Sequence, residues 1–194
     1  MTSKHYGLIS LVILSALSLI NCGGGGGAPG STGSQDTGIQ ITAVQATTTS
    51  ADIDTFCASG ESGQKKQDIS MNITTVNLTP EITTAHFPAS LEECTITYLK
   101  ANEDPAAPII ENLTVFPNCI LNSGTNSCPN ITLIDIARKN QYAIPVFING
   151  TNSPAEYPTH YVAKYNCKYV NNFGKEGFFQ TELDIWLADF AGCN

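Results

Sequence analysis

Hydrophobic and polar residues alternate most clearly near the end of the chain. From residue 161 to residue 169 the odd-numbered positions are apolar or aromatic, whereas Lys164, Asn166 and Lys168 are polar. The alternation returns over residues 178–189, after a glycine-containing loop. The apolar side of this second run consists of Phe179, Leu183, Ile185 and Leu187. Two alternating runs around such a loop predict a β-hairpin with one buried face and one solvent-exposed face.

Shorter patterns upstream predict five more strands. They cover residues 39–46, 68–79, 94–99, 110–116 and 131–137. In the second of these the apolar phase shifts, which suggests a β-bulge near Thr74 and Thr75. Residues 52–63 are polar and are expected to form a loop around Cys57. Residues 138–157 are also expected to be a loop, with at most one short extended piece, because Pro145 interrupts the apolar run 142–148. No 3.6-residue period is convincing. Seven strands joined by polar turns predict a single antiparallel β-sandwich, an all-β fold.

The first 21 residues have the layout of an export signal. Lys4 precedes an uncharged stretch, residues 8–20, that is too short to cross a bilayer core of roughly 30 Å as a helix but typical of a signal peptide. Residues 22–38 contain eight glycines and are expected to form a flexible tether. The folded domain is therefore expected over residues 39–194.

The end of this signal resembles a known processing motif. Leu19-Ile20-Asn21-Cys22 resembles the lipobox of bacterial lipoproteins, in the looser form of some spirochaete lipoproteins because Asn21 stands in place of Gly, Ala or Ser. The resemblance implies cleavage before Cys22 by signal peptidase II and a diacylglycerol on its sulfur. Gly23 resembles the pattern sorted to the outer membrane, with the domain on the periplasmic or the cell-surface side. The alternative is an ordinary secretory peptide, with Cys22 in a disulfide.

The charge of the expected mature chain excludes two classes of partner. Removing residues 1–21 takes away Lys4 and leaves 8 basic and 17 acidic residues, a net charge of 8 − 17 = −9. Nucleic acids and anionic headgroups both require a cationic face. The lipid is therefore the expected membrane contact, and no nucleic-acid partner is expected.

Six cysteines remain besides Cys22, and their even number predicts disulfides in an oxidising compartment. They are Cys57, Cys94, Cys119, Cys128, Cys167 and Cys193. Cys119 and Cys128 flank a turn signal and are expected to pair. In the final hairpin, the numbers of two residues that face each other across the strands should add up to about 348. Cys167 would then face the region of Thr181 and lie too far from Cys193 for a disulfide.

Tyr165-Asn166-Cys167 resembles the Tyr-x-Cys of immunoglobulin-type domains, although the second strand lacks the usual partner cysteine. The resemblance implies that the third strand lies beside the sixth, which would pair Cys94 with Cys167. Cys57 and Cys193 would then form the last disulfide.

Candidate chemistry is sparse. No Gly-x-Ser-x-Gly motif and no Cys-x-x-Cys pair occurs, and the two mature histidines, His86 and His160, lack zinc-finger spacing. The best calcium candidates are Asp52-Ile53-Asp54 and Glu103-Asp104, but both are too sparse in ligands, so no metal and no cofactor are expected. Trp186 is at an even-numbered position and therefore falls on the polar face of the last strand. An exposed tryptophan there could bind a partner or a sugar, although burial at a sheet edge is commoner. Five Asn-x-Thr sequons are interpreted as composition; they begin at Asn72, Asn77, Asn112, Asn130 and Asn149.

These observations predict a non-enzymatic, lipid-anchored envelope protein. The first hypothesis is a binding or adhesion module that recognises a protein or a glycan through its loops or a sheet face. The alternative is a structural or assembly accessory of an envelope complex. An enzyme would need a pocket with convergent polar groups, which the sequence does not indicate.

Overall fold

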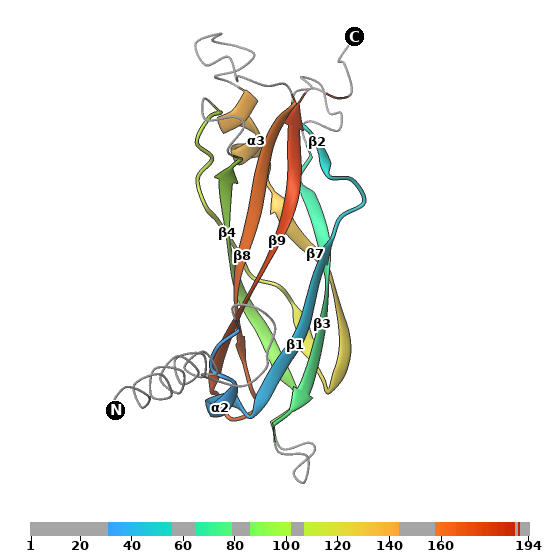
Figure 1. Cartoon of the computed structure of the whole chain (residues 1–194), viewed down its shortest axis with the longest axis vertical. Coiled ribbons are helices and arrows are strands. Elements are labelled where there is room, and N and C mark those ends of the chain that lie inside the picture. The colour runs from blue at the N-terminus through green and yellow to red at the C-terminus, as the bar shows by residue number, and fades with distance from the viewer. Residues whose placement is uncertain are drawn as a thin grey trace, which may run out of the picture.

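The structure is a computed structural model, described for residues 31–55, 65–78, 86–101, 107–143, 158–188 and 190. The described residues are mostly β-strand (Figure 1). The helices are α2 (Ser34–Thr37) and α3 (Ile136–Ala143). The strands are β1 (Ile39–Thr47), β2 (Asp52–Asp54), β3 (Gln67–Asn77), β4 (Ala89–Lys100), β5 (Leu113–Val115), β6 (Cys119–Leu121), β7 (Gly124–Ile134), β8 (Thr159–Val170) and β9 (Glu176–Ala188).

These strands form two sheets packed as an elongated, partly curled sandwich. One sheet has the order β1-β3-β7, and the other has the order β2-β9-β8-β4-β5, with β6 also paired to β4. Neighbouring strands in both sheets are antiparallel except β2, which runs parallel to β9. The predictions of a mostly β chain and of two packed sheets are confirmed. The expectation of purely antiparallel strands is wrong at β2, and the short strands β2 and β6 were not indicated by the sequence patterns.

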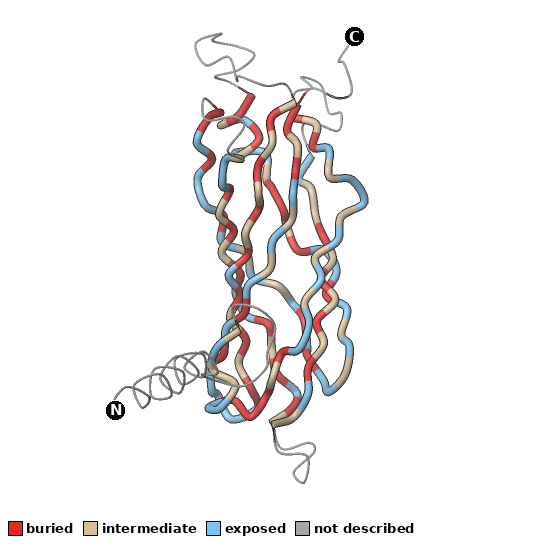
Figure 2. Tube along the Cα trace, in the orientation of Figure 1, coloured by how far each residue is buried: buried red, intermediate tan, exposed pale blue. Residues whose placement is uncertain are grey.

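The core lies between the two sheets, and buried residues alternate along the strands (Figure 2). The strands of the six-stranded sheet bury five aromatic side chains, Tyr98, Tyr161, Tyr165, Tyr169 and Phe179, among aliphatic ones such as Leu91, Ile96 and Ile185. The three-stranded sheet contributes mainly aliphatic ones: Ile39, Ile41, Ile69, Met71, Ile73, Ile131 and Leu133.

The β8–β9 hairpin has the predicted buried and exposed faces, but its turn is centred one residue earlier than expected. Ile185 is fully buried, Leu183 is half-buried and Glu182 is exposed, as the alternation predicts. Facing residue numbers sum to 346 rather than about 348, so that Cys167 faces Phe179 instead of Thr181. The difference arises because the turn closes tightly through a hydrogen bond from the Asn171 N–H to the Lys175 carbonyl oxygen, 2.9 Å long.

The bulge expected near Thr74 and Thr75 lies on the neighbouring strand. Ile41 faces Thr75 and Ala43 faces Thr74, so Thr42 of β1 is the extra residue. The alternation of β3 continues through Thr75, which is fully buried. Its hydroxyl is accommodated because it donates to the Asn122 carbonyl oxygen at 2.6 Å.

Two segments expected to be irregular have regular structure. Asp52–Asp54 forms β2, because its backbone pairs with the end of β9. Residues 136–143 form the helix α3, whereas a strand ending at residue 137 and then a loop were expected. The helix begins where the Asp135 carboxylate accepts a hydrogen bond from the Arg138 N–H at 2.9 Å, a local cap that the strand pattern did not take into account.

The ordered domain also begins earlier than expected. Residues 31–38 were assigned to the tether, but Thr32 forms a β-bridge with Phe178, and α2 lies against β9. Thr37 is fully buried, and its hydroxyl lies 3.2 Å from that of Tyr169. The signal peptide and residues 22–30 lie outside the described residues.

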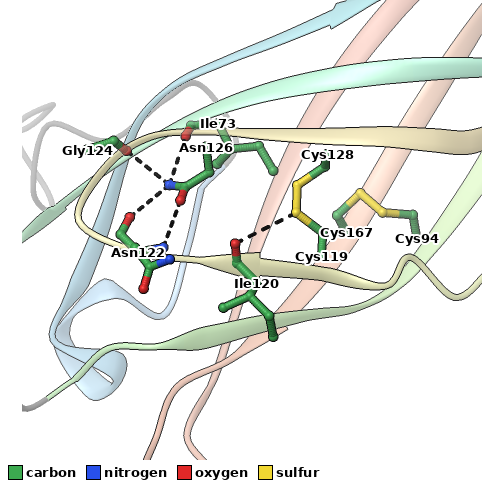
Figure 3. The surroundings of a disulfide bond; sticks show 9 residues. All are labelled: Ile73, Cys94, Cys119, Ile120, Asn122, Gly124, Asn126, Cys128 and Cys167. Carbon is green, nitrogen blue, oxygen red and sulfur yellow. Dashed lines mark hydrogen bonds between the residues drawn. A yellow bond between two sulfur atoms is a disulfide. The ribbon is translucent and has the colours of Figure 1, made fainter.

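Two of the three expected disulfides are present, and they play different roles (Figure 3). Cys94–Cys167 joins facing residues of β4 and β8 within the six-stranded sheet. Cys119–Cys128 joins β6 to β7 and therefore links one sheet to the other. Cys57 and Cys193 lie outside the described residues.

Candidate functional site

A polar hollow of about 480 Å³ lies where the end of β1 approaches the start of β3. Its size is within the range of roughly 300–1,000 Å³ that is common for ligand sites. Its lining is richer in hydroxyl, amide and charged groups than such sites usually are. The lining residues are Thr47, Thr48, Thr49, Lys66, Gln67, Asp68, Ile69, Ser70 and Asn130.

A β-bulge in β7 brings Asn130 into this lining. Ile69 faces Ile131 and Met71 faces Cys128, so β7 has one more residue than β3 over this stretch. Asn130 has a φ of 60°, in the left-handed region that asparagine tolerates better than most residues. It also lines a smaller hollow of about 290 Å³ beside Phe116 and Pro117. The bulge thus places one amide side chain between two depressions.

Short-range contacts hold the polar groups of the hollow. The Gln67 amide donates to the Ser50 carbonyl oxygen at 3.0 Å and to the Thr48 hydroxyl at 3.5 Å. Lys66 and Asp68 form an ion pair with a distance of 2.8 Å between Nζ and Oδ2. A dense set of hydroxyls, amides and one carboxylate can exchange hydrogen bonds with a polyhydroxyl ligand.

A second polar cluster lies on the outer face of the six-stranded sheet. His160 faces Trp186 across the strands, and their rings are stacked with centroids 4.7 Å apart and planes inclined by 8°. The Nε2 atom of His160 lies 2.9 Å from Oδ1 of Asp184. Trp186 is on the polar face, as its parity predicts, and is half-buried. The imidazole covers one face of the indole, which reduces the area that a sugar could stack on.

The calcium candidate in β2 takes part in a contact between two elements. Lys139 of α3 is 2% exposed, and its ammonium donates to the Asp54 carbonyl oxygen at 2.8 Å. Burial lowers the pKa of Lys139, and the nearby Asp54 charge opposes this shift. Asp54 thus helps to hold β2 to α3. Within the described ranges no group of three or more His, Cys, Asp or Glu residues is placed to hold a metal ion. Glu103 and Asp104 lie outside those ranges.

The remaining candidates are scattered over the surface. The His86 ring contacts that of Phe173 edge-on, with centroids 5.7 Å apart. Asn72 and Asn77 are half-buried, Asn112 and Asn130 are exposed, and Asn149 lies outside the described residues.

The polar hollow could not be recognised from the sequence patterns. Its residues come from three strands that are separated in the chain. The Pro129-Asn130 pair lies inside the observed β7 but just before the strand expected over residues 131–137, so the sequence patterns contained no signal of an irregularity within a strand.

Comparisons with known proteins give little further information. No protein-family model and no curated protein sequence matches the chain. A solved structure described as "X-ray structure of Northeast Structural Genomics Consortium target SoR45" is similar at a TM-score of 0.32 and 12% identity, covering 77% of this chain and 87% of that one. A likeness at this level carries no inference about fold or function. None of the helices in the described residues is long and apolar enough to cross a bilayer.

Proposed function

We propose that the protein is a non-enzymatic binding or adhesion module, anchored by a lipid on Cys22 to the bacterial outer membrane. The lipobox-like residues support the anchor, and the two disulfides support an oxidising, extracytoplasmic environment. The four described cysteines are all in disulfides, which removes them as nucleophiles.

We also propose an immunoglobulin-like architecture for the sandwich. The Tyr165-Asn166-Cys167 segment and the position of β4 beside β8 support it. The variant would be unusual, because Cys167 pairs within one sheet, whereas the disulfide typical of antibody domains joins two sheets.

The observation that carries the binding proposal is the polar hollow beside Asn130. Its hydroxyl, amide and carboxylate groups match the hydrogen-bonding pattern of a glycan better than that of an apolar ligand. The Asp68 carboxylate is the strongest acceptor in the lining, and charge-assisted hydrogen bonds contribute more than neutral ones. We therefore expect a glycan ligand.

Binding of the full-length protein to a glycan array tests this proposal. We expect Asp68→Asn to weaken binding of the selected glycan about tenfold, because a hydrogen bond to a charged group contributes about 1.5–3 kcal/mol. Thr49→Ala should have a smaller effect in the same direction. Glu182→Gln, an exposed change on the other sheet, is the matched control. Equal affinity for the Asp68 variant and the control would exclude this hollow as the site.

The lipid anchor and the cellular location are tested separately. Cys22→Ala should release the protein from membranes or leave its precursor uncut. A Cys22→Ala variant of mature size that still fractionates with membranes would contradict lipid anchoring. Protease added to intact cells should digest the wild-type protein if it acts as an adhesin, whereas protection would favour an accessory of an envelope complex.

A further inference from the structure

The turn between β8 and β9 is held rigidly although it lies on the surface. Asn171 is 5% exposed, and its Oδ1 accepts hydrogen bonds from the N–H groups of Phe173 (2.9 Å) and Lys175 (2.8 Å). Its Nδ2 donates to the Thr37 carbonyl oxygen at 2.8 Å. The side chain of Asn171 therefore fixes the shape of the turn and ties it to the last residue of α2, just before β1.

This rigid turn presents an aromatic ring to the outside. Phe173 is 60% exposed at the tip, supported on one side by the edge of the His86 ring. Lys175 is exposed beside it, and the adjacent Glu176 carboxylate lies 3.4 Å from the Lys168 ammonium. An exposed phenylalanine next to a lysine, on a turn that does not depend on either side chain for its shape, suits the boundary between headgroups and acyl chains.

The chain leaves the domain at the same end. Thr32 pairs with Phe178, which is itself 46% exposed, and α2 lies at the end of the molecule opposite α3 (Figure 1). Cys22 precedes Ser31 by nine residues. At a maximum of about 3.3–3.6 Å per residue, this segment keeps Ser31 within roughly 30 Å of its lipid.

From these two observations we propose that the β8–β9 turn is a second, non-covalent contact with the bilayer. Phe173 inserts at the headgroup level, Lys175 faces the headgroups, and the end of the sandwich that carries α3 points away from the membrane. This proposal rests on lipid attachment at Cys22.

Quenching by brominated phospholipids tests this orientation. The full-length lipidated protein is reconstituted in vesicles as two single-tryptophan variants, Phe173→Trp/Trp186→Phe and Ile109→Trp/Trp186→Phe. Ile109 is the matched control because it is 80% exposed and follows Pro108, whose carbonyl oxygen accepts a hydrogen bond from Tyr161 near the opposite end of β8. The wild-type protein, with Trp186 near the end of β9, is a second control.

We expect the brominated lipid to abolish most of the fluorescence of the Phe173→Trp variant and to leave that of the Ile109 variant and the wild type unchanged. A vesicle-bound protein without quenching at position 173 would overturn the orientation alone. Equal quenching of both variants would overturn it too, because the domain would then lie on its side. Failure of the wild type to float with vesicles would overturn both the anchor and this contact. Phe178→Trp/Trp186→Phe repeats the measurement if the Phe173 variant does not fold.

Discussion

The inner faces of the two sheets differ in their content of aromatic side chains. The six-stranded sheet turns tyrosines toward the core beside its leucines and isoleucines, whereas the residues that β1, β3 and β7 bury are mainly isoleucines, with a methionine and a leucine and without an aromatic ring. The Tyr98 hydroxyl donates to the Leu133 carbonyl oxygen of β7 at 2.6 Å, and the Tyr169 hydroxyl donates to the Ile39 carbonyl oxygen of β1 at 3.1 Å. The larger sheet thus binds the backbone of both edge strands of the smaller sheet.

Tyr165 lies in the same face but differs from both. Its hydroxyl is buried and has no hydrogen-bond partner among the described residues. Tyr165 thus contributes the area of its ring without a hydroxyl contact, whereas Tyr98 and Tyr169 contribute both.

The largest effect is expected for a charge in the buried face of the six-stranded sheet. Ile185→Asp should unfold the domain, because an unpaired carboxylate in a dry interface costs several kcal/mol. Glu182→Lys, on the exposed side of the same strand, should leave the thermal midpoint nearly unchanged. Circular dichroism of both variants measures this, and equal midpoints would refute the assignment of the two faces.

The second effect concerns the disulfides. Replacing both Cys94 and Cys167 by alanine should cost up to about 4.5 kcal/mol from the loop-closure relation, and replacing Cys119 and Cys128 up to about 2.7 kcal/mol. The sequence separations are 73 and 9 residues, which gives the order. Urea titration checks it. A larger loss for the second pair would mean that linking the two sheets matters more than loop length.

The third effect is alkaline destabilisation. Burial raises the pKa of Tyr98 and of Tyr165, with a smaller contribution from neighbouring charges. The folded state holds the phenol protons more tightly than the unfolded chain does. The contribution of these tyrosines to folding stability is therefore complete below the pKa of tyrosine in the unfolded chain, about 10, and is lost as the pH rises above that value. Stability should fall by up to about 1.4 kcal/mol per pH unit for each tyrosine. Urea midpoints at pH 9 to 12 measure this slope, which should decrease in Tyr98→Phe and Tyr165→Phe. A flat profile would contradict the burial of both rings.

The fourth effect isolates one contact between the sheets. Tyr98→Phe should destabilise the domain by about 1–3 kcal/mol, because the Leu133 carbonyl oxygen loses its buried donor. The ring and its packing remain. An unchanged urea midpoint at neutral pH would show that this hydroxyl contributes nothing to joining the sheets.

The smallest effect is expected for Tyr165→Phe. Because its hydroxyl lacks a partner among the described residues, its removal should change stability by a few tenths of a kcal/mol or increase it. Differential scanning calorimetry beside Tyr98→Phe sharpens the contrast. A loss as large as that of Tyr98→Phe would indicate a hydrogen bond to Tyr165 that the described residues do not include.

The buried face of β8 and β9 can be predicted from the sequence far better than the contacts that this face makes. Alternation identified it because the polarity of each residue indicates on which face of the strand its side chain lies. It could not assign the partner of the Tyr98 hydroxyl, which depends on the position of a strand 35 residues away. β2 was missed because three residues carry no period, and only pairing with β9 makes them a strand. The hollow beside Asn130 was missed for the same reason, since a bulge is defined by register with another strand.

That bulge also affects how neighbouring molecules meet. Among the described strands β7 lies at the edge of its sheet, and an open edge can act as a template on which other chains add and aggregate. Pro129 has no N–H, and the left-handed backbone at Asn130 turns the strand out of a regular ladder. A strand from another copy would therefore find no regular ladder to extend at this position. We expect the bulge to disfavour the joining of β7 to β7 into a continuous sheet.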